Sequence, residues 1–199
     1  FNDSHPLFCA TEIIKSYMTE HNMSFEKARE AARKNIVFTT HTPVPAGNEV
    51  HDLKVLEYMS AYNGLTKEQI TDIGGDPFGM TVAGLRAAKI ANSVAKLHCK
   101  TANKMWADVR DSAKIVNVTN GVHNKTWQSS EIKQAYLNKG DLYSVHQTLK
   151  QQLIDEIYKR NGVKLLIDVP IIGFAKRAAP YKRGDLIFRD KAVIEPLLK

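Results

Sequence analysis

Apolar residues recur every three or four positions along much of the chain, and this spacing predicts a series of amphipathic helices. The first begins after Pro6, a residue that is favourable in a first helical turn. Ser24 and the sequence TKEQ at 66–69 are typical of the N-terminal caps of two further helices. The predicted helices cover residues 7–21, 25–35, 50–64, 66–75, 80–98, 101–110, 130–160 and 192–198.

Three short runs rich in β-branched and aromatic residues interrupt this helical pattern and predict buried strands. They are IVFTT at 36–40, IVNVT at 115–119 and IIGFA at 171–175. The last run is apolar throughout, which is typical of a strand covered on both faces. Helices that alternate with such strands predict an α/β fold with a parallel sheet flanked by helices.

The composition narrows the class of protein. Of the 199 residues, 43% are hydrophobic and 25% are charged, as in ordinary globular domains. No apolar run approaches the ~18 residues of a membrane span, and two cysteines cannot form a disulfide scaffold. The first residues also lack the pattern of a secretion signal. We therefore expect a cytoplasmic protein with no membrane partner. The net charge of +7 favours an anionic partner, either nucleic acid or a phosphorylated metabolite, or reflects no specific partner.

Three polar loops are candidates for the functional site. Ligands of open α/β sheets collect at the carboxyl ends of the strands. The turn Asn2–His5, the loop HTPVPAGNE at 41–49 and the loop AKRAAPYKRGD at 175–185 are all expected there. Pro43 and Pro45 keep the second of these loops from being helical.

His41 directly follows a predicted strand, and its residue type leaves several roles open. A buried structural histidine is one interpretation. A zinc site that includes His51 or Glu49 is disfavoured, because the spacing has neither helical nor finger geometry. A separate hypothesis, a catalytic triad of Ser4, His5 and Asp3, is also disfavoured. Adjacent residues on one turn cannot align a nucleophile, a base and an orienting group.

Two basic pairs, Lys176-Arg177 and Lys182-Arg183, lie in the third loop with Tyr181 as the only aromatic residue among them. A solvated surface cluster is one interpretation. A nucleic-acid partner is disfavoured, because such sites interleave more aromatic residues with cations spread along a face. An oxyanion site is the third interpretation, because the first pair emerges from the end of a strand and a guanidinium presents a planar fork to phosphate.

Four motifs follow one another in an order and at intervals that match one enzyme family. They are NDSHP at 2–6, FTTHTPVPAGNE at 38–49, NVTNGVHNKTW at 117–127 and GFAKRAAPYKR at 173–183. Together they resemble the α-glucan phosphorylases, which include the glycogen, starch and maltodextrin phosphorylases. The form HTPVPAG is similar to that of the shorter bacterial and archaeal branch, and the resemblance extends over nearly all residues.

This resemblance implies a two-domain glycosyltransferase fold of the GT-B type, with the active site in the cleft between the domains. Family members transfer the terminal α-1,4-linked glucosyl unit of a glucan to inorganic phosphate and release glucose 1-phosphate with retained configuration. Their cofactor is pyridoxal 5′-phosphate, whose phosphate group serves as proton donor and acceptor. The implied partners are an α-1,4-glucan and phosphate, with no nucleic acid, and a homo-oligomer is left open.

The motifs also imply roles at the sugar. Asp3 matches the family aspartate near the glucosyl site. His41 matches the histidine that contacts the glucosyl unit, and this match makes it a candidate catalytic residue. Asn48, in the same loop, is chemically suited to binding sugar hydroxyls.

Further roles are implied at the phosphates. Lys176 and Arg177 match the basic pair that contacts the phosphates of cofactor and substrate, and both are candidate catalytic residues. Lys182 matches the second lysine of that loop, which also lies near the phosphates.

The resemblance identifies the chain as a central fragment. Residues 1–150 would be the C-terminal portion of the first domain, 151–168 a helical connection, and 169–199 the start of a second, Rossmann-like domain. The lysine that binds the cofactor covalently in the family would lie beyond this sequence, so the isolated chain is expected to be inactive. The alternatives are a nucleotide-sugar-dependent glycosyltransferase of the same fold and a non-catalytic carbohydrate-binding paralogue.

Overall fold

The computed structural model describes residues 1–44 and 47–198, and it confirms an α/β fold with a parallel sheet flanked by helices. The chain forms two compact units, Phe1–Val122 and His123–Lys199. Pro45, one of the two prolines expected to shape the 41–49 loop, lies outside the described residues. None of the helices in the described ranges has the length and apolar character needed to cross a membrane.

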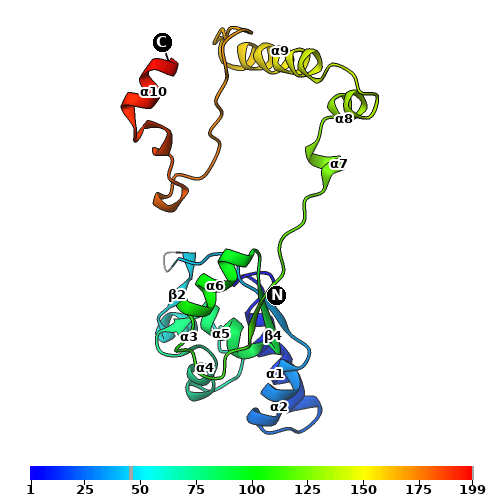
Figure 1. The fold of residues 1–199 in the computed structure, drawn as a ribbon. Helices are drawn as coiled ribbons and strands as arrows, with labels where there is room; N and C mark the ends of the chain where they lie inside the picture. Colours follow the sequence, from blue (N-terminus) through cyan, green and yellow to red (C-terminus); the bar gives the residue numbers. More distant parts are fainter. Residues whose placement is uncertain (45–46, 199) are drawn as a thin grey trace. The chain divides into compact units, whose positions relative to one another are not determined.

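The first unit is built on a three-stranded parallel sheet with β4 in the centre (Figure 1). In spatial order, the strands are β1 (Val37–Thr39), β4 (Ile90–Ser93) and β5 (Ile115–Asn117). The first residues run parallel to β1, because the Thr39 N–H donates to the Phe1 carbonyl at 2.8 Å and the Asp3 N–H donates to the Thr39 carbonyl at 2.9 Å. β1 and β5 confirm two of the predicted strands.

The central strand corrects the prediction of one helix over residues 80–98. Three elements occupy this range in turn: α5 (Met80–Ala87), β4 and the start of α6 (Lys96–Met105). Within β4, Ala91 and Ser93 are fully buried. Because β4 forms hydrogen bonds with a strand on each side, tertiary pairing overrides its local helical pattern.

The helix predicted over 101–110 is shifted, because α6 begins at Lys96 and ends at Met105. The other helices in the described part of this unit lie where they are predicted, although one is shorter. They are α1 (Phe8–Glu20), α2 (Phe25–Arg33), α3 (Leu53–Tyr58) and α4 (Lys67–Gly74). α3 falls short of the predicted range 50–64, partly because β2 (Val50–His51) pairs with β3 (Phe78–Gly79). Beyond α3 the backbone is left-handed at Ser60 and Gly64, which is incompatible with a continuing helix.

Phe38 lies at the centre of the apolar core of the first unit. Its side chain is 0% exposed, and it projects from β1 against α5. A Cβ atom added at Gly84 of α5 would lie 2.5 Å from the Phe38 ring. The missing side chain at Gly84 therefore allows the helix to pack directly on the strand.

The start of α4 confirms the predicted capping box. The Gln69 N–H donates to Thr66 Oγ1 at 3.3 Å, and the Thr66 N–H donates to Gln69 Oε1 at 2.8 Å. The two side chains therefore satisfy backbone N–H groups that have no acceptor within the helix.

Thr66→Ala is expected to destabilise α4 by about 1 kcal/mol, because an N–H group of the first turn loses its acceptor. Amide hydrogen exchange in the complete protein measures this effect. α2 is an internal control, because its own cap is Ser24. Unchanged exchange in α4 would contradict a stabilising role for the cap.

The second unit is mainly helical, as predicted, but two helices separated by residues 138–141 occupy the range predicted as helical over 130–160. Its elements are α7 (Asn124–Trp127), α8 (Ser130–Leu137), α9 (Leu142–Asn161), the 3-10 turns η2 (Pro180–Lys182) and η3 (Leu186–Phe188), and α10 (Lys191–Leu198). Asp141 caps α9 by accepting hydrogen bonds from two N–H groups of its first turn, and Gly162 ends the helix in a left-handed conformation. Lys150 donates to main-chain carbonyls within 167–169 and holds that segment against α9.

The predicted buried strand at 171–175 is wrong for this structure. The segment is irregular, and the side chains of Ile172 and Phe174 are 65% and 56% exposed. A strand requires neighbours for its N–H and C=O groups, and the described part of the second unit contains no other strand. Ile172 and Phe174 instead line a hollow of about 800 Å³ together with residues 182–184 and 186–188.

The domain boundaries predicted at 150 and 168 refer to the domains of a longer protein. The two compact units of this structure divide between Val122 and His123. Because this division reflects contacts within the chain alone, the predicted boundaries stay a prediction.

Candidate functional site

Two of the three predicted polar loops meet at the carboxyl edge of the parallel sheet. Ser4, in the Asn2–His5 turn, donates from Oγ to Glu49 Oε2 in the loop after β1 at 3.4 Å. The segments after β4 and β5 reach the same edge, where the Asn120 N–H donates to the Val94 carbonyl at 3.1 Å. We call this set of segments the strand-end cluster: residues 2–5, 41–44, 47–49, 94–98 and 118–120.

His41 is held in place by the side chain of Asn2. Its Nε2 atom lies 2.5 Å from Asn2 Oδ1. Because an amide oxygen only accepts hydrogen bonds, Nε2 carries the proton and donates it. Asn2 is a site residue that the sequence pattern does not single out, and its place beside Asp3 in the NDSHP motif is the signal that points to it.

Asp3 sits at the sharp turn between the sheet edge and α1. Its backbone is left-handed, with φ at 61°, a conformation that aspartate adopts more readily than most residues. The residue is half-buried, and its carboxylate acts electrostatically on His98. Asp3 thus places a negative charge within the strand-end cluster.

Asn48 shapes the loop after β1. Its Nδ2 atom donates to the carbonyls of Thr42 and Val44 at 3.2 and 2.7 Å. Its Oδ1 atom accepts from Thr81 Oγ1 at 2.6 Å, which ties the loop to the start of α5. In this structure the amide group is used within the protein, and the role of Asn48 in binding sugar hydroxyls stays a prediction.

His98 is a second site residue that the sequence pattern misses, because the predicted helix over 80–98 hides its position. It lies near the start of α6 and is only 8% exposed. Its Nδ1 atom accepts from the Val94 N–H at 3.3 Å, so the neutral ring carries its proton on Nε2. Nε2 has no hydrogen-bond partner among the described residues.

The environment of His98 favours the uncharged ring. Burial lowers the pKa of His98, because it penalises the charged form, and the neighbouring His41 lowers this pKa further. The carboxylate of Asp3 opposes both effects. The net lowering means that His98 is a neutral donor at physiological pH.

The third predicted loop lies in the second unit. Lys176 and Arg177 are exposed, and Lys182 is half-buried at the end of η2. The Lys176 ammonium lies 5.8 Å from the centre of the Phe174 ring, and the Lys182 ammonium lies 5.0 Å from that of Tyr181. Within the described ranges no carboxylate pairs with these three cations, so they are available to an anion.

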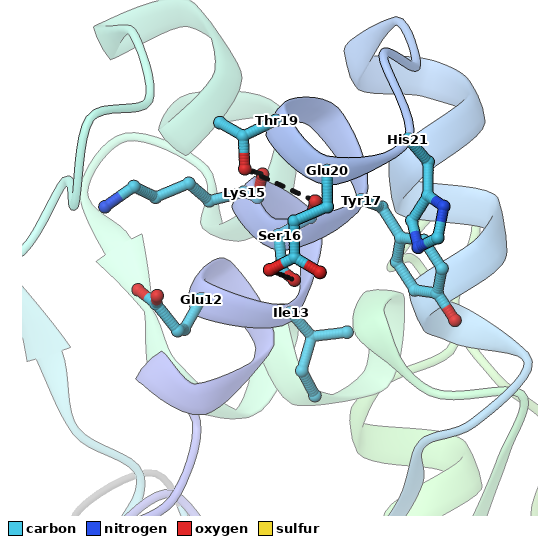
Figure 2. A pocket seen from close by; sticks show the side chains of 8 residues that line it. All are labelled: Glu12, Ile13, Lys15, Ser16, Tyr17, Thr19, Glu20 and His21. Carbon is cyan, nitrogen blue, oxygen red and sulfur yellow. Dashed lines mark hydrogen bonds between the residues drawn. The ribbon is translucent and has the colours of Figure 1, made fainter.

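A separate hollow of about 490 Å³ lies along α1 (Figure 2). Its lining comes from this one helix and the residue that follows it. The polar groups partly satisfy one another, since Ser16 Oγ donates to Glu20 Oε1 at 2.7 Å and Thr19 Oγ1 donates to the Lys15 carbonyl at 3.0 Å. The strand-end cluster, which gathers groups from several elements, is the stronger candidate site.

Several known proteins are similar to this chain in sequence, although no family model matches it. An uncharacterised protein of Methanocaldococcus jannaschii is 32% identical over 201 positions, which cover 100% of this chain and 37% of that protein. The maltodextrin phosphorylase of Thermococcus litoralis is 33% identical over 233 positions, which cover 95% and 28%. The glycogen phosphorylase of Aquifex aeolicus is 28% identical over 242 positions, which cover 95% and 35%.

The alignment lengths indicate how many additional residues each relative has within the matched region. The alignments with the two named phosphorylases exceed the 199 residues of the chain, so both proteins have additional residues within the matched region. The alignment with the M. jannaschii protein is nearly free of such insertions.

The chain spans 28–37% of the length of these three relatives. The resemblance seen in the four motifs is therefore confirmed, and the chain is a homologue of the maltodextrin and glycogen phosphorylases along nearly its whole length.

Proposed function

We propose that the complete protein is an α-1,4-glucan phosphorylase, which transfers the terminal glucosyl unit of a glucan to inorganic phosphate and releases glucose 1-phosphate with retained configuration. The observation that carries this proposal is the similarity to a maltodextrin phosphorylase over 95% of the chain. Because the chain spans only part of its relatives, the activity is assigned to the complete protein, and the isolated chain is expected to be inactive.

The strand-end cluster supports the sugar-binding half of this function. A terminal glucosyl unit presents neutral hydroxyl groups, which must meet donors and acceptors held in fixed positions. His41, oriented by Asn2, is assigned to contact the glucosyl unit as a catalytic residue. Asp3 and Asn48 are assigned to substrate binding, and the Asp3 carboxylate is suited to the positive charge that develops on the sugar ring.

The basic loop supports the phosphate half. Two phosphate groups in one cleft repel each other by about 4 kcal/mol per pair of charges at ~4 Å and an effective dielectric constant near 20. Nearby cations would offset this repulsion. Lys176, Arg177 and Lys182 are suited to this role, because none of them pairs with a carboxylate in the described structure. Arg177 adds a fork that matches phosphate oxygens.

These three residues also fit the phosphate group of pyridoxal 5′-phosphate, the cofactor that the family implies. When bound, the cofactor supplies a phosphate that exchanges a proton with the substrate phosphate. Lys176, Arg177 and Lys182 would hold both anions and keep them oriented. The covalent link to a lysine is assigned to sequence beyond this chain.

The same proposal includes the arrangement of the complete protein. Its two domains would form a GT-B fold, with residues 1–150 in the first domain, 151–168 as a connection and 169–199 in the second. We also propose a cytoplasmic location, and the molar mass of the complete protein in solution would distinguish a monomer from a homo-oligomer.

An activity assay on the complete protein tests the proposal. We expect that maltodextrin and phosphate together yield glucose 1-phosphate, measured by coupling to phosphoglucomutase and a dehydrogenase. Glucosyl transfer from a nucleotide sugar, with no use of phosphate, would instead identify a nucleotide-sugar-dependent glycosyltransferase. Glucan binding without either reaction would identify a non-catalytic paralogue. The same assay on the uncharacterised M. jannaschii relative would show whether both proteins share the activity.

A further inference from the structure

His98 has an unused hydrogen-bond donor in a buried position. Only 8% of the residue is exposed, and its Nε2 atom is itself buried and finds no acceptor among the described residues. Buried polar groups in folded proteins nearly always have a partner, because an unpaired one costs free energy. A free N–H at this position therefore requires an explanation.

Two other polar side chains of the strand-end cluster form hydrogen bonds within the protein. His41 pairs with Asn2, and Asn48 accepts from Thr81. His98 itself uses Nδ1 to accept from the Val94 N–H, which fixes the ring relative to the end of the central strand. The ring is thus oriented through one nitrogen while the other is left for a different acceptor.

We propose that His98 binds the glucan substrate by donating a hydrogen bond from Nε2 to a sugar hydroxyl at the carboxyl edge of the sheet. This inference rests on the proposed function, because that function supplies the hydroxylated ligand. It adds a substrate-binding residue outside the four motifs.

The charges around His98 favour a neutral acceptor over a phosphate. The ring is uncharged, because burial and the neighbouring His41 lower the pKa of His98. The negative charge of Asp3 acts on the same ring and would repel an anion there. A sugar hydroxyl has no charge to be repelled and accepts a hydrogen bond from a neutral N–H.

Two substitutions distinguish the role of Nε2–H as a hydrogen-bond donor from the structural role of Nδ1, which accepts from the Val94 N–H. In His98→Asn the amide oxygen can replace Nδ1 as acceptor for the Val94 N–H, but no group reaches the place of Nε2. In His98→Gln the longer amide can place an N–H near that position. We expect His98→Asn to weaken binding of maltoheptaose by about three- to tenfold, the usual range for one hydrogen bond, and His98→Gln to recover part of the loss.

Calorimetric titration of the complete protein with maltoheptaose measures these affinities, and thermal unfolding of each variant shows whether the fold is kept. Nitrogen-15 NMR of labelled histidine adds a readout that a purely structural role would not change. We expect the Nε2–H signal of His98 to shift on addition of maltoheptaose.

The outcomes separate the inference from the function on which it rests. If wild-type protein binds maltoheptaose and releases glucose 1-phosphate, while His98→Asn binds it equally well, the inference is overturned alone. An Nε2–H signal that stays unchanged at saturating maltoheptaose overturns it as well. If wild-type protein neither binds glucan nor forms glucose 1-phosphate, the proposed function and the inference fail together.

Discussion

Arg177→Ala in the complete protein is expected to lower turnover by about 10²- to 10³-fold, the loss usually caused by removing one preorganised donor from a developing charge. Arg177 is exposed and has no carboxylate partner in the described structure, so its charge is available to phosphate. The loss should depend on phosphate more than on glucan, because the guanidinium is assigned to the anion and not to the sugar.

Initial rates measured over a range of phosphate and maltodextrin concentrations test this expectation. Arg183→Ala is the matched control, because Arg183 lies in the same loop but has no assigned role. Its substitution should change turnover much less. Arg177→Lys should recover only part of the activity, because an ammonium cannot form the bidentate contact of a guanidinium. A phosphate dependence in Arg177→Ala equal to that of the wild type would refute the assigned role.

Phe38→Ala is expected to destabilise the first unit by about 3–5 kcal/mol, the usual cost of truncating a buried phenylalanine. The ring is fully buried and fills the space above Gly84, so its removal leaves a cavity between β1 and α5. Because β1 leads into the loop that carries His41, the same substitution should also loosen the strand-end cluster.

Urea unfolding of the complete protein, followed by amide exchange in β1 and α5, measures this loss. Val37→Ala is the control, because the neighbouring Val37 is 50% exposed on the same strand and should cost much less. Similar stability of the two variants would contradict the packing described for Phe38.

Elements whose signals are local could be predicted from the sequence. The capping box of α4 and the Ser24 cap of α2 depend on residues three positions apart, and both are present in the structure. β4 could not be predicted in this way, because its strand conformation comes from hydrogen bonds to β1 and β5, which are distant in sequence. The strand predicted at 171–175 is wrong for the converse reason. Its local apolar pattern favours a strand, but the described part of its unit contains no neighbouring strand with which it could pair.

The candidate site shows the same limit. The turn at Asn2–His5 and the loop that carries His41 could be predicted from the sequence, because each follows a segment of the sheet and matches a motif. The pairing of Asn2 with His41 joins residues 39 positions apart, and only the fold brings them together. His98 could not be recognised, because its burial and its free Nε2 atom are properties of tertiary structure.

Phosphorus-31 NMR of the complete protein with maltodextrin, inorganic phosphate and pyridoxal 5′-phosphate would show directly whether the protein cleaves glucan with phosphate. We expect the phosphate signal to fall while that of α-glucose 1-phosphate rises, and omission of maltodextrin to abolish the change. A spectrum in which inorganic phosphate persists unchanged while maltodextrin and cofactor are both present would contradict this expectation.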